Sequence, residues 1–301
     1  MQQNIPEFLI KMLEEQYGEE LTKQIIDGYS KNRLTTFRVN NLKSNKEEVE
    51  KVLQQENIEF ENPSFYKEAY IVKNANEAKL QELEIYKDGK IYLQSLSSML
   101  PPIILGPKEN IDILDMAAAP GGKTTQMATM SNNKAHITAC EMNAIRAERL
   151  KYNIEKQGAS CVYCMVKDAR TIDNFFSFDQ ILLDAPCSGS GTINSNDTNL
   201  SKYFTEKLIE KSTKVQKALL NKAINILKKG CEMVYSTCSI LQEENEEMLN
   251  SVLKTGKVEI IPIENDFINS LPLLPTKIKG TLTIMPNELF EGFFVAKLKR
   301  I

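Results

Sequence analysis

Residues 111–124 read IDILDMAAAPGGKT, and this stretch decides the fold that the sequence predicts. Ile111, Ile113 and Leu114 form a short apolar run typical of a parallel strand that is buried on both faces, and Asp115 ends that run. Alanines and glycines follow, which let another molecule approach the backbone closely. Lys123 then begins a predicted helix. A strand, a tight loop of small residues and a helix N-terminus together form a common site for a nucleotide-like ligand.

Two kinds of ligand fit this loop. AAAPGGKT differs from the phosphate-binding pattern GxxxxGK[ST] only by Ala117 in place of the first glycine, and ILLDAP (181–186) resembles a magnesium-binding strand end. The other ligand is S-adenosylmethionine, which loops of this kind bind on a Rossmann-like sheet. A structural turn that binds nothing is a third interpretation. The loop alone does not decide between them, so the later strands must.

The composition is that of a globular protein without a basic excess. The chain has 301 residues, of which 42% are apolar and 26% are charged, with a net charge of −3 and a pI of about 5.6. A nucleic-acid partner therefore has to bind a local patch. No apolar stretch is long enough to cross a bilayer, and the N-terminus does not resemble a signal peptide. We expect a cytoplasmic protein whose cysteines are reduced.

The cysteine and histidine content restricts the possible metal sites. Cys161 and Cys164 form a CxxC pair, but no second such pair follows, and His136 is the only histidine. A structural zinc site would lack ligands, and a Ser-His-Asp triad would depend on His136 alone. We interpret all three residues as structural and expect no metal.

Strand and helix signals divide the chain into two parts. Residues 5–30 have apolar residues at helix spacing, and strand, helix and further strand signals follow. Pro101 and Pro102 are predicted to end a helix in the connecting segment. From residue 111 strands and helices alternate, which predicts an α/β fold with a doubly wound, mostly parallel, Rossmann-like sheet. We expect a small N-terminal α+β module at 1–100, of a common kind that often binds RNA on its sheet face, and an α/β domain at 101–301. The predicted strands of the larger domain are 111–115, 136–141, 162–167, 179–184, 231–236 and a last pair within 257–299.

Acidic residues at two successive strand ends distinguish the possible ligands. Glu141 ends the second predicted strand about twenty residues after the glycines, where a carboxylate can accept hydrogen bonds from ribose hydroxyls. Asp168 ends the third strand, within reach of an adenine amino group. Carboxylates beside a triphosphate would repel it unless a metal intervened. S-adenosylmethionine is therefore favoured over ATP, although both carboxylates could instead cap the helices that follow.

Two later strand ends carry cysteines. ILLDAPCSGSGT (181–192) contains Asp184 and Cys187, and MVYSTCS (233–239) contains Cys238, so both loops face the same crevice. Together with DMAAAPGGKT, FRVNNLK (37–43) and the C-terminal MPNELFEGFFVAKLKR, these motifs resemble the Nop/Sun family of RNA (cytosine-5) methyltransferases. The resemblance runs from the first predicted strand to the C-terminus.

The resemblance implies a Rossmann-like class I methyltransferase that uses S-adenosylmethionine to form 5-methylcytosine, in ribosomal RNA or, as the closest alternative, in transfer RNA. Cys238 would add to carbon 6 of cytosine, which makes carbon 5 reactive enough to take a methyl group, and Cys187 would assist product release. Asp184 would hydrogen-bond the base near N3, and Lys123 would add positive charge. The implied cofactor residues are Ala117, Ala118, Ala119, Pro120, Gly121, Gly122, Lys123, Glu141, Arg146, Asp168 and Asp184.

The resemblance also implies RNA contacts in the N-terminal module. Arg38, Asn40 and Lys43 would hold phosphates, with ordinary surface charge as the alternative. The loop INSNDTNL (193–200) lacks the basic residues that many relatives have there, and we expect no RNA-binding domain after GFFVAKLKR. Target choice would therefore depend on the module and the catalytic face. We expect an RNA partner, no metal, no membrane and a monomer.

Two other classes of protein share part of this pattern. A P-loop-like ATPase would bind ATP with magnesium and would not bind S-adenosylmethionine. A ribosome-assembly factor that binds RNA without catalysis would keep the fold. The retention of cysteines at both strand ends argues against the second class.

Overall fold

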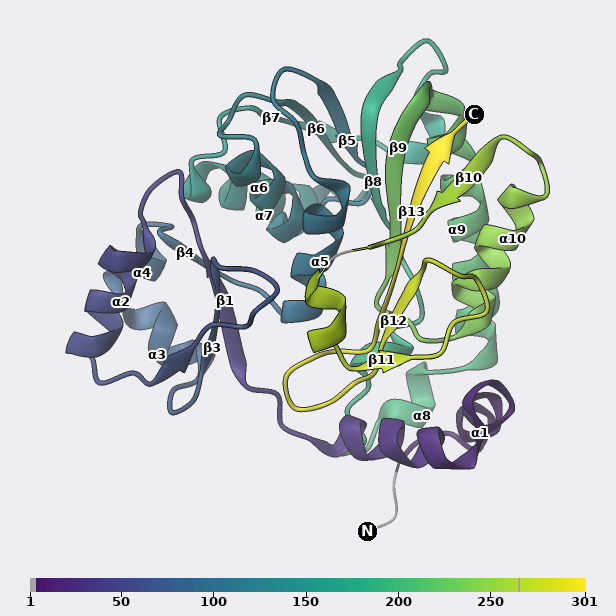
Figure 1. Cartoon of the computed structure of the whole chain (residues 1–301), viewed down its shortest axis with the longest axis horizontal. Helices are drawn as coiled ribbons and strands as arrows, with labels where there is room; N and C mark the ends of the chain where they lie inside the picture. Colours follow the sequence, from purple (N-terminus) through teal and green to yellow (C-terminus); the bar gives the residue numbers. More distant parts are fainter. Residues whose placement is uncertain (1–3, 265) are drawn as a thin grey trace.

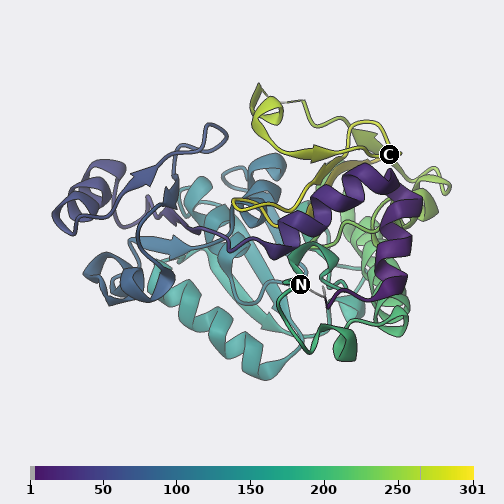
Figure 2. The same cartoon turned by 90° about the horizontal axis from the view of Figure 1, so that it is seen from below.

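The computed structural model describes residues 4–264 and 266–301, and they form two sheets. A four-stranded sheet near the N-terminus lies to one side of a nine-stranded sheet (Figure 1). Figure 2 shows the same arrangement from below, with the N-terminal helix α1 (Glu7–Ser30) running across the larger part of the molecule. Within these described ranges, no helix has the length and apolar content needed to cross a membrane.

The small sheet is antiparallel throughout and has the order β2-β3-β1-β4. Phe37 and Val39 of β1 pack into the core of this module, beneath helix α2, whose Val49 and Leu53 face the same core. Asn45 begins α2 because its side chain accepts a hydrogen bond from the Glu48 N–H. The elements of the module are β1 (Thr35–Val39), α2 (Lys46–Gln55), β2 (Phe60–Glu61), β3 (Ala69–Val72), α3 (Glu77–Glu82), α4 (Glu84–Lys87) and β4 (Ile91–Leu93).

The large sheet is mostly parallel and confirms the predicted Rossmann-like fold. Its order is β11-β12-β13-β9-β8-β5-β6-β7, with β10 paired to β13. The strands from β7 to β9 run parallel, and β13 pairs antiparallel with β9. The strands are β5 (Asp112–Asp115), β6 (His136–Glu141), β7 (Val162–Val166), β8 (Phe178–Asp184), β9 (Leu227–Thr237), β10 (Val258–Ile261), β11 (Leu273–Leu274), β12 (Leu282–Ile284) and β13 (Phe293–Arg300).

Helices cover both faces of this sheet. Ile113 of β5 packs in the cluster that contains Met99 of α5 and Met127 of α6, whereas its neighbour Leu114 packs with Leu220 of α9 on the other face. Successive strand residues point to opposite faces, so this alternation follows from β geometry. The helices are α5 (Leu96–Leu105), α6 (Gly122–Met130), α7 (Ala144–Gln157), α8 (Leu200–Tyr203), α9 (Glu206–Ile226) and α10 (Glu246–Leu253), with single 3₁₀ turns at η1 (Ala169–Thr171), η2 (Ser190–Thr192), η3 (Gln242–Glu244) and η4 (Asp266–Ser270).

Two predicted features of the secondary structure are wrong. Pro101 and Pro102 lie inside α5 and do not end it. Pro102 has no N–H for the carbonyl of Ser98, but the side-chain amide of Gln94 donates to that carbonyl at 3.0 Å, so the helix continues. The segment 257–299 contains four strands and not one pair, because β11 and β12 are too short to show an alternating pattern.

Helix α1 packs on the larger part of the molecule. Its Leu9, Leu13 and Ile25 share a cluster with Phe204 and Leu241. The hydroxyl of Tyr17 also donates to the carbonyl of Ile240 at 2.6 Å, and Ile240 lies in the segment that follows β9. The division of the chain into residues 1–100 and 101–301 stays a prediction.

Arg38 joins the two sheets. Its side chain is 0% exposed, and Nε donates to Gln94 Oε1 at 2.8 Å. Nη2 reaches across to α6, where it donates to Thr125 Oγ1 at 2.8 Å and to the carbonyl of Gly122 at 3.0 Å. Burial lowers the pKa of Arg38 to about 10, since the charged form loses water. The predicted RNA contact of Arg38 therefore disagrees with the structure.

The other two predicted RNA contacts differ from each other. Asn40 is also fully buried, and its amide donates to the carbonyls of Gly89 and Gln157, both at 2.8 Å. Its predicted RNA contact disagrees with the structure for the same reason. Lys43 is exposed, with Nζ 3.1 Å from the carbonyl of Asp88, and its RNA contact stays a prediction.

We expect Arg38→Ala to lower the free energy of unfolding by roughly 2–4 kcal/mol, because it removes buried hydrogen bonds of a charged group. Urea denaturation measures this change. Lys43→Ala is the matched control from the same segment and should change the value by less than about 0.5 kcal/mol. Equal small effects of both substitutions would contradict the structural role of Arg38.

Candidate active site

A pocket of about 1060 Å³ opens at the carboxyl ends of β5 and β8. The strand order reverses at β5, and ligands of open α/β sheets bind at such a reversal. The pocket extends from the small-residue loop to the N-terminal module. Its lining includes Asp115, Ala117, Ala118, Ala119, Pro120, Gly122, Lys123, Asp184 and Cys238, and on the module side Arg33, Thr36, Glu77 and Tyr92.

Neighbouring elements hold the small-residue loop in place. The N–H of Ala118 donates to the carbonyl of Cys140 on β6 at 2.9 Å. Arg146 Nη2 donates to the carbonyl of Ala119 at 2.8 Å, so Arg146 positions the loop from α7. Gly121 has φ 110°, and a Cβ there would lie 3.0 Å from Leu150 Cδ1. The loop therefore requires glycine at this position.

Asp115 presents an unpaired carboxylate oxygen at the floor of the loop. Its side chain is 1% exposed, Oδ2 accepts a hydrogen bond from the Thr124 hydroxyl at 2.7 Å, and Oδ1 has no partner among the described residues. Burial raises the pKa of Asp115 to about 6, and the negative charge of Asp184 contributes to this rise. The hydrogen bond from Thr124 lowers the pKa but only partly offsets the effect of burial. An unpaired buried carboxylate fits a ligand that carries an amino group and repels a triphosphate. S-adenosylmethionine therefore suits these residues better than ATP does.

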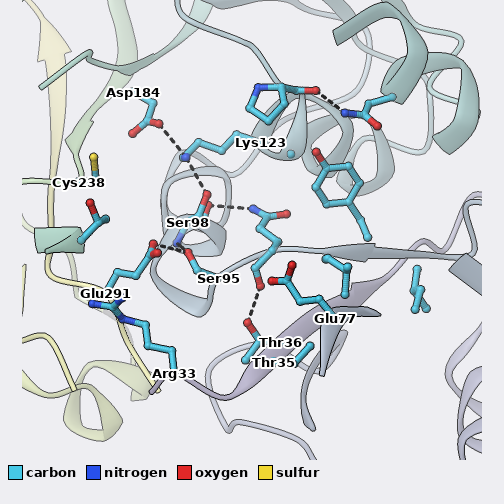
Figure 3. Close-up of a pocket in the computed structure, with 18 of the residues that line it drawn as sticks. Arg33, Thr35, Thr36, Glu77, Ser95, Ser98, Lys123, Asp184, Cys238 and Glu291 are labelled. Atoms are coloured by element: carbon cyan, nitrogen blue, oxygen red, sulfur yellow. Dashed lines mark hydrogen bonds and ion pairs between the residues drawn. The ribbon is translucent and has the colours of Figure 1, made fainter. Parts of the chain in front are cut away.

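Lys123 and Asp184 form an ion pair in the pocket. Lys123 Nζ lies 2.8 Å from Asp184 Oδ2 and donates to the hydroxyl of Ser98 at 2.7 Å (Figure 3). The other oxygen of Asp184 accepts a hydrogen bond from Ser236 at 2.7 Å. Burial alone would lower the pKa of Lys123, but the charge and hydrogen bond of Asp184 raise it above its ordinary value. Lys123 therefore stays a cation in this pocket.

The two predicted cysteines lie in contact. The sulfurs of Cys187, after β8, and Cys238, after β9, are 3.0 Å apart. The hydrogen bond with Cys238, followed by burial, raises the pKa of Cys187 well above its ordinary value. Cys187 therefore keeps its proton and can donate it toward Cys238, which lines the pocket.

The remaining predicted cofactor residues lie at the same edge of the sheet. In the part of the chain that the structure describes, Glu141, Arg146 and Asp168 are outside the pocket lining. Glu141 Oε1 accepts a hydrogen bond from the N–H of Asn143 at 2.8 Å. The carboxylate of Asp168 accepts from the backbone N–H and the guanidinium of Arg170, which lowers its pKa. Asp168 thus makes the capping contact that was the alternative to cofactor binding, whereas α7 is capped by the Asn143 side chain and Glu141 accepts a hydrogen bond from the N–H of that residue. The cofactor roles of Glu141 and Asp168 stay predictions.

The pocket also contains polar residues that sequence reasoning missed. Ser98 is bonded to Lys123, and the hydroxyl of Ser95 donates to Glu291 Oε2 at 2.7 Å (Figure 3). Arg33 lines the same pocket, and its Nε and Nη2 have no partner among the described residues. The segment SLSS offered no motif, whereas Glu291 lies in MPNELFEGFF, which the resemblance used without assigning a role to any residue.

The sheet order, the loop and the pocket define a Rossmann-like domain of the methyltransferase class. A sequence profile described as 16S rRNA methyltransferase RsmB/F matches residues 102–299, and a profile for the ferredoxin-like domain of RsmF/B-like methyltransferases matches residues 5–79. The chain belongs to the RsmB/F family. The resemblance to Nop/Sun RNA (cytosine-5) methyltransferases is thereby confirmed.

Individual proteins similar to this chain are RNA methyltransferases by name. The chain is 35% identical to ribosomal RNA small subunit methyltransferase F of Shewanella piezotolerans, over 88% of this chain and 57% of that protein. It is 34% identical to a tRNA (cytosine(49)-C(5))-methyltransferase of Pyrococcus abyssi, over 88% of each chain. A solved methyltransferase homolog from Pyrococcus horikoshii has a TM-score of 0.82 and 29% identity, over 99% of this chain and all of that one. The chain thus spans little more than half of the Shewanella relative.

We expect Asp115→Asn to stabilise the protein at pH 7.5 in the absence of S-adenosylmethionine. The folded-state pKa of about 6 lies above the ordinary value of 3.8, so the stability of the unsubstituted protein falls as pH rises from about 4 to about 6. The substitution should therefore raise the free energy of unfolding by about 1–3 kcal/mol at pH 7.5 and have little effect at pH 4.

Urea denaturation at both pH values measures this difference. Asp112→Asn, at the exposed start of the same strand, is the control and should change the free energy of unfolding by less than about 0.5 kcal/mol. Loss of stability in Asp115→Asn at pH 7.5 would mean that the carboxylate is satisfied within the folded protein.

Proposed function

We propose that this protein is an RNA (cytosine-5) methyltransferase that uses S-adenosylmethionine. The observation that carries the proposal is the contact of 3.0 Å between Cys187 and Cys238, beside the ion pair of Lys123 and Asp184. A structural role for the cysteines does not require an ammonium and a carboxylate next to them in a pocket. Membership of the RsmB/F family supports the same activity.

The loop 117–122, Asp115, Lys123 and Asp184 would hold S-adenosylmethionine, and Glu141, Arg146 and Asp168 would complete its site. When bound, this cofactor supplies an electrophilic methyl group. The unpaired oxygen of Asp115 and the presence of the small-residue loop in the pocket lining support this assignment. Residues of the chain then have two tasks, which are to orient the base and to activate it.

Cys238 activates the base. Its thiolate adds to carbon 6 of the cytosine, and the electron density pushed to carbon 5 lets that carbon take the methyl group. Asp184 hydrogen-bonds the base near N3, and Lys123 stabilises the negative charge that the addition creates. Loss of the carbon 5 proton then expels the Cys238 sulfur. Cys187, which keeps its own proton, assists this release by donating a hydrogen bond to the departing sulfur.

The RNA approaches along the pocket between the two sheets. A base inside a duplex cannot reach Cys238, so the target must be single-stranded or flipped out. Arg33 and Lys156 line the pocket on the side of the module and α7, and they offer cations to the RNA backbone. We therefore place the flanking phosphates near these residues, in place of Arg38 and Asn40.

Ribosomal RNA is the proposed substrate, in line with the 16S rRNA methyltransferase profile. Transfer RNA is the second candidate, because the tRNA methyltransferase of Pyrococcus abyssi matches over 88% of both chains, whereas the rRNA relative extends well beyond the match. We propose action as a monomer in the cytoplasm, without a metal.

We expect Cys238→Ala to abolish methyl transfer, because the substitution removes the thiolate that adds to carbon 6. Cys187→Ala should instead accumulate a covalent protein–RNA adduct, since the first bond still forms while release is slowed. Transfer of a labelled methyl group and a denaturing gel measure the two outcomes. Normal turnover of Cys238→Ala would refute the mechanism, and Cys140→Ala, a buried cysteine of β6, is the control that should keep activity.

We expect bisulfite sequencing of cellular RNA to lose a protected cytosine when the gene is deleted. A lost site in ribosomal RNA supports the first substrate, and a lost site only in transfer RNA supports the second. Restoration by the unsubstituted gene, but not by the Cys238→Ala gene, ties the site to this pocket. No change in either RNA would contradict the proposed activity.

A further inference from the structure

Glu244 is a buried carboxylate in the segment that follows Cys238. Its side chain is 0% exposed. Oε1 accepts hydrogen bonds from the backbone N–H of Ser188 at 2.7 Å and from Gln216 Nε2 at 3.4 Å, and Oε2 accepts one from the Ser188 hydroxyl at 2.6 Å. Short charge-assisted bonds of this kind offset the loss of water around a buried charge. The carboxylate therefore links two loops that are 56 residues apart in sequence.

The Glu244 carboxylate bonds Ser188, the residue next to Cys187. Ser188 directly follows Cys187, whose sulfur is 3.0 Å from that of Cys238. Glu244 is itself held to β9, because the hydroxyl of Tyr235 donates to its backbone carbonyl at 2.6 Å. Tyr235 lies in β9, just before Cys238. Cys238 and Glu244 thus belong to one fixed segment, and the Glu244 side chain ties the Cys187 loop to it.

Separate contacts hold the far end of the Cys187 loop. The N–H of Gly191 donates to the carbonyl of Cys238 at 2.9 Å, and the Ser190 hydroxyl lies 2.8 Å from that of Ser239. These bonds do not involve Glu244. Loss of the Glu244 carboxylate should therefore loosen the beginning of the loop, where Cys187 lies, without releasing all of it.

The charge of Glu244 also affects Cys187, because it raises the pKa of the Cys187 thiol. The hydrogen bond with Cys238 and burial are the largest causes of the raised pKa of Cys187, and electrostatic interactions with Cys238 and with the Glu244 carboxylate raise it further. Glu244 thereby favours the protonated thiol at residue 187. Only a protonated Cys187 can donate to the neighbouring sulfur.

We propose that Glu244 is a positioning residue that fixes Cys187 at hydrogen-bonding distance from Cys238 and keeps Cys187 as the proton donor of the pair. The consequence for product release rests on the function proposed above. The positioning of Cys187 by Glu244 does not depend on that function, and it can be tested in protein without RNA.

The first experiment measures alkylation of each cysteine by iodoacetamide across pH 6–10 (about the range in which thiols ionise), with peptide mass spectrometry as readout. Glu244→Gln can keep both contacts with Ser188 while removing the charge, and should shift Cys187 labelling to lower pH. Glu244→Ala should in addition raise the labelling rate at a given pH. Glu247→Gln removes an exposed charge from α10 as the control and should match the unsubstituted protein. Unchanged Cys187 labelling in both Glu244 variants overturns the proposal.

The second experiment follows RNA turnover. Glu244→Ala should slow product release by at least about tenfold, the rate equivalent of one charged hydrogen bond, and accumulate the covalent adduct while kcat/KM for RNA stays the same. Should Glu244→Ala fail to fold, Ser188→Ala removes the hydroxyl contact alone and should change both readouts less, in the same direction. Normal release in Cys187→Ala would contradict the role of Cys187 in the proposed function. The labelling result then still decides whether Glu244 positions that residue.

Discussion

The reversal of strand order at β5 is the constraint on which the rest of the site depends. β5 pairs in parallel with β6 on one side and with β8 on the other, so the loops that leave their carboxyl ends diverge and leave a crevice. The small-residue loop forms one wall of this crevice, and Asp184 at the end of β8 forms another. Because β9 runs parallel beside β8, Cys238 comes to lie against Cys187. Side chains from distant parts of the sequence meet only because the sheet orders its strands in this way.

Polar contacts, and not an apolar interface alone, attach the module to this sheet. Phe37 and Val39 of β1 face the core of the module, whereas Arg38 on the opposite face reaches the first turn of α6. The same turn carries Lys123. A buried guanidinium with fixed partners tolerates few alternative orientations, so the contacts of Arg38 specify how the module sits against α6. The module therefore forms a defined side of the pocket.

The sequence predicted β5, β6 and β8 well, because each of these strands is largely apolar and ends in an acidic residue, at Asp115, Glu141 and Asp184. It missed the first four residues of β9, whose LKKG has no apolar run. That both cysteines face one crevice followed from the rule that loops at carboxyl ends share one edge, whereas their direct contact is seen only in the structure. Arg38 was misinterpreted because strand alternation identifies two faces but does not say that a second sheet covers one of them.

Other differences also have a structural cause. The prolines of α5 are tolerated because Gln94, which precedes the helix, satisfies the carbonyl that Pro102 leaves free. The Ser98 contact with Lys123 needs two segments that only the folded chain brings together. The sequence around Ser98 or around Lys123 does not by itself indicate that these two residues are hydrogen-bonded to each other.

The docking of α1 has a practical consequence for shortened forms of the protein. Removing the first thirty residues, α1 included, would uncover Phe204 and Leu241 and delete the partners of the Ile240 carbonyl, two residues after Cys238. Such a form would retain every residue of the pocket lining and yet lose contacts that support the segment after Cys238. The N-terminal helix thus supports the loop that carries Cys238, although none of its residues lines the pocket.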